Sequence, residues 1–213
     1  VNLSDMAAMS AKPIFYNLSI SIPKNKVRYF IPKFSKGLDE DQELFGVKLI
    51  GGDLTSSLQD INITITIFGE TLNKKSISRS GAKSGDLLFV SGVLGLSKIG
   101  LDNFKSTSRA FSSAKKKYLF PQPRVNLGLS LNKIANSMID ISDGLFQDAG
   151  HLAKSSKLSI VIDVEKIPIP VSINLKKDTL LNAALFGGDD YELLFSCKPI
   201  NEKFLKKISS NQN

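Results

Sequence analysis

Aspartates stand beside glycines at three points of the 213-residue chain, each close to the end of an apolar run. The three segments are Gly51-Gly52-Asp53, Asp140-Ile141-Ser142-Asp143-Gly144 and Gly187-Gly188-Asp189-Asp190. Magnesium prefers oxygen ligands and commonly takes one or two carboxylates together with substrate phosphates. Glycines beside those carboxylates let a phosphate approach the backbone closely. The pattern therefore fits magnesium-assisted chemistry on a phosphorylated substrate.

The central segment is the most informative of the three. Asp140 and Asp143 are three residues apart across a turn that opens a helix near Gly144, so both could face one metal cluster, with the helix amides directed at an anion. Aspartate before glycine is also a common turn residue, and Ser142 or Asp143 would make a good helix N-cap. Each segment alone is better explained as a turn or cap. Together the three leave metal binding and local structure evenly matched.

Other nucleotide-binding patterns are missing from the sequence. It contains neither the Gly-x4-Gly-Lys-Ser/Thr motif of P-loop enzymes nor Gly-x-Gly-x-x-Gly. Cys197 and His151 are the only residues of their types, which excludes an internal disulfide and a structural zinc site. Cys197 lies in an apolar run and is expected to be a core thiol, and a Cys–His nucleophile pair would need the two residues to meet.

The composition is that of a globular protein, with 42% hydrophobic residues and a net charge of +8. The basic residues are spread, with one cluster at Lys115-Lys116-Lys117, and tryptophan is absent. We therefore expect a solvated lysine-rich surface and no nucleic-acid partner. No apolar run reaches the roughly 18 residues of a membrane span, and the start does not resemble a signal peptide. These features predict a cytoplasmic protein without a membrane partner.

The first half of the chain contains the helices and strands that would position Asp53. The pattern predicts a short helix over residues 4–11, capped near Ser4 or Asp5 and stopped by Pro13. Strands are expected at 14–22, 47–50 and 61–68, the second ending in Gly51-Gly52-Asp53. A helix over 25–45 should be kinked or split at Pro32.

The polar run at residues 80–86 suggests a domain boundary near residue 80, giving domains 1–80 and 81–213. The second half predicts strands at 87–91, 158–164 and 192–197. Helices are expected at 94–104, 125–135 and 145–155. The segment 167–170 holds too much proline for a central strand. The fold class is therefore mixed α+β, with two domains.

Six motifs in order resemble those of thiamine-monophosphate kinases, in the aminoimidazole-ribonucleotide synthetase superfamily. They lie at residues 1–9, 49–53, 79–86, 121–124, 140–151 and 187–193, and begin with Val1-Asn2-Leu3-Ser4-Asp5. No single motif is specific, but six in sequence across nearly the whole chain are. The resemblance implies the two-domain synthetase-like fold. It also implies that this chain lacks N-terminal and C-terminal segments that family members carry.

The resemblance also implies roles for individual residues. Asp5, Asp53, Asp140 and Asp143 would be magnesium ligands, and Gly52, Asp53, Arg79 and Ser142 would contact ATP. Asp189 would contact the substrate, at a place where the family usually has glutamate, which reaches further. Asp148 and His151 fit the pattern, with His151 more in keeping with a structural role.

The activity implied is magnesium-assisted transfer of a phosphoryl group from ATP directly to thiamine monophosphate, in a homodimer. No covalent or general-base residue is expected, because the acceptor phosphate is already an anion. Two other readings stay open: a related ATP-using synthetase of the same superfamily, and a nucleotide-binding protein without catalytic activity.

Overall fold

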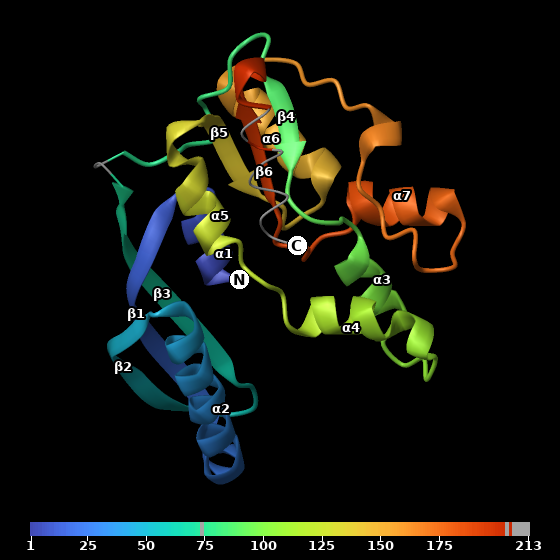
Figure 1. Cartoon of the computed structure of the whole chain (residues 1–213). Coiled ribbons are helices and arrows are strands. Elements are labelled where there is room, and N and C mark those ends of the chain that lie inside the picture. The colour runs from blue at the N-terminus through green and yellow to red at the C-terminus, as the bar shows by residue number, and fades with distance from the viewer. Residues whose placement is uncertain (73–74, 203–204, 206–213) are drawn as a thin grey trace.

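The computed structural model describes residues 1–72, 75–202 and 205, and confirms the mixed α+β class (Figure 1). Its first part contains α1 (Asn2–Ala8), β1 (Ala11–Pro23), α2 (Lys24–Phe45), β2 (Lys48–Ser57) and β3 (Asn62–Thr71). The second part contains β4 (Leu87–Val90), α3 (Leu96–Asp102), α4 (Ser112–Leu119), α5 (Val125–Ser130), β5 (Ala135–Asp140), α6 (Leu145–Ser156), α7 (Lys177–Phe186) and β6 (Leu193–Cys197). Each part builds one sheet of three strands from its described residues.

The first sheet has the order β2-β1-β3, with β1 parallel to β2 and antiparallel to β3. Side chains of β1 alternate strictly: Tyr16, Leu18, Ile20 and Ile22 are buried, and Ser19 between them is exposed. The buried set packs against the apolar side of α2, which covers this face of the sheet (Figure 1). The opposite face lies open.

Three expectations for this part are wrong in detail. The first helix begins at Asn2, so Ser4 is buried inside it and neither Ser4 nor Asp5 is the cap. Pro13 lies within β1, at an irregularity in the pairing with β3, where a missing N–H is tolerated. The helix α2 is not split at Pro32, because packed residues on both sides of the proline, such as Val27 and Phe34, hold it on the sheet; a kink there stays a prediction.

The strand predicted at 47–50 continues to Ser57, so Asp53 does not stand at a strand end. Gly52 is required by contact rather than by a turn: a Cβ there would lie 1.8 Å from the carbonyl oxygen of Leu18 on β1. Asp53 is instead paired with Ser19 in mid-strand.

The second sheet is antiparallel throughout, in the order β4-β6-β5. One face, with Ile139 and Leu194, packs on α6. The other, with Met138, Leu193 and Phe195, packs on α1 and α5. Figure 1 shows α1 (blue) beside α5 (yellow). Since α1 packs on both sheets, a domain boundary near residue 80 stays a prediction, although that residue does lie between them.

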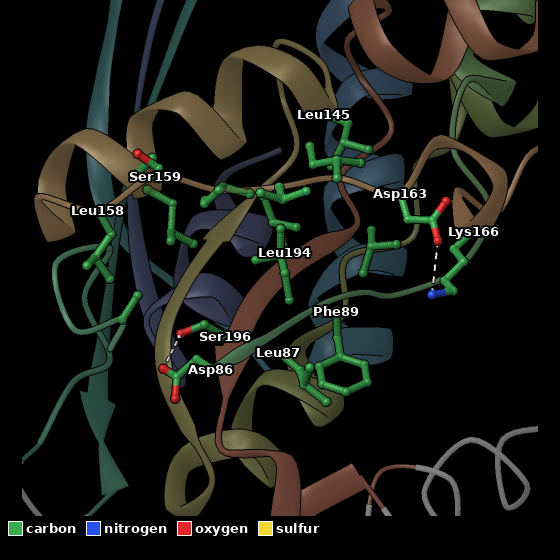
Figure 2. Close-up of a pocket in the computed structure, with 18 of the residues that line it drawn as sticks. Asp86, Leu87, Phe89, Leu145, Leu158, Ser159, Asp163, Lys166, Leu194 and Ser196 are labelled. Carbon is green, nitrogen blue, oxygen red and sulfur yellow. Dashed lines mark hydrogen bonds and ion pairs between the residues drawn. The ribbon is translucent and has the colours of Figure 1, made fainter. Parts of the chain in front are cut away.

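The predicted strand at 158–164 is wrong. Residues 158–163 run extended but join no ladder, and among the described residues the backbone groups of Ser159 to Ile162 have no backbone partner. They lie across a groove of about 820 Å³ from the edge strand β4, and Figure 2 shows the apolar side chains that line it, among them Leu87, Phe89 and Leu194. Without a neighbouring strand at hydrogen-bonding distance, an apolar run cannot form a sheet.

The burial of Cys197 and the character of the helices bear on two expectations from composition. Cys197 is fully buried in β6, as expected of a core thiol. Within the described ranges, no helix combines the length and apolar character needed to cross a membrane.

Candidate functional site

Acidic side chains converge where α1 packs beside the end of β5. Ala7 and Ala8 seat α1 in the core shared with β5 and β6, which fixes Asp5 on the same helix. Asp140, the last residue of β5, is buried and close enough for its charge to act on Asp5. Arg79, in the loop after the first sheet, also acts on Asp5. We call Asp5, Asp140 and Arg79 the acid cluster.

The electrostatics of the acid cluster suit a divalent cation. Partial burial of the Asp5 carboxylate, and next the negative charge of Asp140, raise the pKa of Asp5, while Arg79 works in the opposite direction. A bound cation would stabilise the ionised form of Asp5, which burial and the charge of Asp140 disfavour. Oxygen donors of this kind match the preferences of magnesium. The residues present therefore fit the predicted metal.

The loop after β5 is organised by Asp148 of α6. One oxygen of this buried carboxylate accepts hydrogen bonds from the backbone N–H groups of Ser142, Asp143 and Gly144, at 3.1, 3.0 and 3.2 Å. Burial raises the pKa of Asp148, against the opposing effect of these N–H groups. Asp148 thus fixes the loop that leads into α6; the N-cap residue of that helix is Gly144, without a side-chain cap, so the expectation that Ser142 or Asp143 would cap it is wrong.

Asp143 is exposed and accepts hydrogen bonds from Gln147 at 2.6 Å and from the Ser142 hydroxyl at 3.2 Å. Ligand atoms of Asp143, Asp148 and His151 all lie within 4.8 Å of one another, and Asp140 is not part of that group. The structure thus places Asp143 beside His151. A single ion shared by Asp140 and Asp143 stays a prediction.

The loop of residues 187–190 contacts the loop of residues 140–144 through backbone hydrogen bonds. The amide of Asp189 donates to the carbonyl of Ser142, and that of Tyr191 to the carbonyl of Ile141, both at 2.9 Å. Gly188 permits this approach, because a Cβ there would lie 2.2 Å from the Ser142 oxygen. The structure therefore brings Asp189 to the loop of Ser142 and Asp143.

Tyr191 is a site residue that the sequence did not single out. Its hydroxyl donates to Asp189 at 2.9 Å, and both residues have positive φ angles, 50° and 65°. Burial, then the hydrogen bond and charge of Asp189, then the charges of Asp140 and Asp5, raise the pKa of Tyr191. The phenol therefore stays protonated and serves as a neutral donor next to the acid cluster.

Asp53 is not brought to this cluster within one chain. It is paired with Ser19, so its side chain lies on the open face of the first sheet. The start of α1 lies on the other face: Val1 to Leu3 line a small cavity with Tyr16 and Ile65. The sheet therefore stands between Asp53 and Asp5, and Gly52 sits with Asp53 on the edge strand β2.

A buried ion network next to Tyr191 was also missed. Glu192, 1% exposed, pairs with Lys117 and Arg124. The lysine cluster at residues 115–117 was expected on a solvated surface, which is wrong for Lys117, since its side chain is only 12% exposed. The signal was available: a glutamate opens the otherwise apolar run of β6.

Three comparisons with known proteins agree with one another. Residues 1–71 match the family model described as AIR synthase related protein, N-terminal domain. A thiamine-monophosphate kinase of Buchnera aphidicola subsp. Schizaphis graminum is 41% identical over 98% of this chain. The chain spans 65% of the length of that relative.

Solved structures agree. The crystal structure of thiamine-monophosphate kinase from Stenotrophomonas maltophilia K279a is 32% identical, with a TM-score of 0.91, over 99% of this chain and 69% of that one. The structure described as AaThiL complexed with AMPPCP and TMP is 32% identical, with a TM-score of 0.86, over 94% of this chain and 66% of that one. These similarities confirm the synthetase-like fold expected from the motifs.

Proposed function

The chain belongs to the thiamine-monophosphate kinase family, and from this membership we propose that the protein transfers a phosphoryl group from ATP to thiamine monophosphate, giving thiamine diphosphate. The observation that carries the proposal is the acid cluster of Asp5, Asp140 and Arg79, with Asp189 and Tyr191 beside it. A relative of this chain was solved with AMPPCP and TMP, a pair that matches a nucleotide and a phosphorylated acceptor.

Magnesium bound by Asp5 and Asp140, with Asp143 and Asp53 as further carboxylates, would supply positive charge against the phosphates. Arg79 is exposed at the cluster, where its forked guanidinium can hold two phosphate oxygens of ATP. Ser142, half-buried in the loop capped by Asp148, offers a hydroxyl to the nucleotide. Asp189 would orient the acceptor with the help of the Tyr191 hydroxyl.

These residues position the reactants and stabilise charge. The acceptor phosphate is already ionised, so the transfer needs no group to remove a proton from it. Holding donor and acceptor oxygens in line, with nearby positive charge, is the main contribution that a protein makes to such a reaction. Direct transfer, without a phosphorylated side chain, is the mechanism that we propose for this family member, and it is consistent with this division of roles.

We also propose that two copies form a homodimer in which Asp53 and Gly52 of one protomer complete the site of the other. The support is geometric: within one chain Asp53 lies on the face of the sheet opposite Asp5. Phe15 and Phe68, paired across β1 and β3 and 40% and 45% exposed, give the same open face an apolar centre that a partner could cover. A cytoplasmic location belongs to this proposal, since the lone cysteine is reduced and ATP is available there.

The test uses the natural full-length protein with ATP, magnesium and thiamine monophosphate, and measures thiamine diphosphate. Product that is lost in Asp5→Asn and retained in Asp60→Asn, which removes the same charge from an exposed turn, supports the proposal. A folded protein that binds ATP and yields no thiamine diphosphate would overturn it. Phosphorylation of a different acceptor would instead favour a related synthetase.

A further inference from the structure

The loop that carries Asp189 and Tyr191 has an unusual conformation. Both residues have left-handed backbone angles, which residues other than glycine rarely adopt and which persist only where surrounding contacts enforce them. The residues that alternate with them, Asp190 and Glu192, are 0% and 1% exposed. The loop thus directs two carboxylates into the protein and two functional side chains toward the acid cluster.

Asp190 anchors one side of the loop. Its carboxylate accepts hydrogen bonds from the backbone N–H groups of Gly95 at 2.5 Å and Ser97 at 3.1 Å, at the start of α3. Burial raises the pKa of Asp190, while these two N–H groups favour its ionised form. The anchor therefore ties the loop to α3.

Glu192 anchors the other side. Its two oxygens accept hydrogen bonds from Arg124 Nε and Nη2 at 2.7 and 2.8 Å, from Lys117 at 2.7 Å and from the Ser91 hydroxyl at 2.6 Å. Burial works to raise the pKa of Glu192, but the hydrogen bonds and charges of Arg124 and Lys117 outweigh it and hold the pKa low. Gly92 lies directly against this carboxylate: a Cβ at position 92 would lie 2.5 Å from the Glu192 carboxyl carbon, so a side chain there would collide with it.

The two cations come from elements that surround the site. Lys117 lies on α4, which packs on α3. Arg124 immediately precedes α5, against which α1 and therefore Asp5 is packed through Gly128 and Ala7. Lys117 and Arg124 both pair with the buried Glu192, and the charge of Lys117 also acts on Asp190. Removing either cation leaves a buried carboxylate partly uncompensated, and the strained loop next to it can relax to expose that carboxylate.

We propose that Lys117 and Arg124 are positioning residues that act through Glu192 to hold Asp189 and Tyr191 at the acid cluster. Among the described residues, the hydrogen bonds and ion pairs of both cations go to Glu192 and none to Asp189 or Tyr191, so their effect on the site passes through the anchor and the backbone of the loop. The kinetic part of this inference rests on the proposed function, and the structural part does not.

The experiment uses the full-length protein with tyrosine labelled at the ring carbon that bears the hydroxyl, and records NMR spectra at one fixed pH. Four of the labelled tyrosines lie within residues 1–213, and the signal that disappears in Tyr191→Phe is that of Tyr191. Lys117→Met and Arg124→Lys are compared with Lys116→Met, an exposed neighbour on α4. We expect the Tyr191 signal to move in the first two variants and to stay in place in the third. Tyr118, on the same helix, reports any disturbance of α4 itself.

The kinetic readout separates positioning from general stability. Provided that the full-length protein is an active kinase, Lys117→Met and Arg124→Lys should raise KM for thiamine monophosphate about tenfold, as loss of the residues that support a site commonly does. KM for ATP should change far less. Arg124→Lys keeps the charge and loses only the two-point contact, so it answers the question where Lys117→Met does not fold. An unmoved Tyr191 signal in folded Arg124→Lys overturns the inference. If the full-length protein has no kinase activity, the proposed function is refuted. The NMR comparison then still decides whether Lys117 and Arg124 position the loop.

Discussion

The amide of Asp189 donates a 2.9 Å hydrogen bond to the carbonyl oxygen of Ser142, joining two loops across a separation of 47 positions in the sequence. Asp143, Asp189 and Tyr191 are carried by these loops, so one backbone contact relates a predicted metal ligand to a predicted substrate contact. The contact depends on Gly188, whose missing side chain lets the two backbones meet.

Gly188→Ala should therefore destabilise the protein. A methyl group 2.2 Å from the Ser142 oxygen forces the loops apart, and overpacking of this kind costs about 1–3 kcal/mol. Urea unfolding measures the loss. Gly150→Ala is the matched control: nothing lies within 4 Å of a Cβ there, and alanine favours α6 by up to about 1 kcal/mol, so that variant should gain stability. Equal effects of the same sign in both variants would contradict the contact.

Asp5→Asn should abolish the rise in Tm that magnesium produces, because it removes a carboxylate from the acid cluster. Thermal unfolding with and without magnesium measures this, with Asp60→Asn as the control. A rise in Tm that persists unchanged in Asp5→Asn would show that the ion binds elsewhere.

In the absence of metal, Asp5→Asn should stabilise the protein at neutral pH. The folded-state pKa of Asp5 lies above its unfolded value, so the folded state binds more protons between the two and stability falls as pH rises through that window. The penalty is complete above the folded pKa and absent below the ordinary aspartate pKa of about 3.9. Unfolding free energies should be measured in the presence of a chelator from pH 3 to pH 8, in steps of about half a pH unit. Asp5→Asn should be more stable than the parent protein only toward the upper end of this pH range.

Tyr191→Phe removes the hydroxyl that donates to Asp189. Loss of one hydrogen bond to a charged acceptor should cost about 1–2 kcal/mol in unfolding free energy, at the low end because Asp189 is reachable by water. KM for the acceptor should rise as Asp189 loses its orientation. Tyr29→Phe, at an exposed position of α2, should leave both unfolding and kinetics unchanged.

Mixed dimers decide whether Asp53 acts across the interface. Asp5→Asn and Asp53→Asn should each be inactive alone. When Asp53 serves the partner's site, a heterodimer of the two variants has one intact site, and random mixing should recover about a quarter of the parent activity. The assay follows thiamine diphosphate after the two variants are unfolded and refolded together. No recovery from a mixture shown to contain heterodimers would place Asp53 in its own chain's site.

The parts of the fold that follow from local pattern were predictable. The alternation in β1 and the apolar stripe of α2 came out as expected, because a covered sheet face and a packed helix impose those periods. Asp53 was misplaced since Gly51-Gly52 has the composition of a turn, and only the partner strand β1 reveals that Gly52 serves a close contact. Pro13 and Pro32 were given too much weight, as tertiary packing holds both within regular elements.

The site was predictable where a motif fixes a residue's neighbourhood, as for Asp140 at the end of β5. Pairings across long separations were not. Lys117 and Glu192 are 75 positions apart, and nothing local distinguishes Lys117 from the solvated Lys116. Which lysine of a cluster is buried depends on how α4 packs on α3 and on which side chain then reaches Glu192, and that is decided by the assembled core.

The groove beside β4 has a consequence for handling the protein. In an antiparallel ladder, alternate residues direct their backbone groups to opposite edges, and Ser91 bonds to Leu193 on the β6 side. Leu88 and Val90 therefore turn their N–H and C=O groups toward the groove, where the extended run 158–163 offers a second unpaired edge. Leu87–Val90 carries no charged side chain to discourage pairing. In the part of the chain that the structure describes, this edge thus offers a template onto which extended apolar segments can add, and concentrated preparations should aggregate from it first.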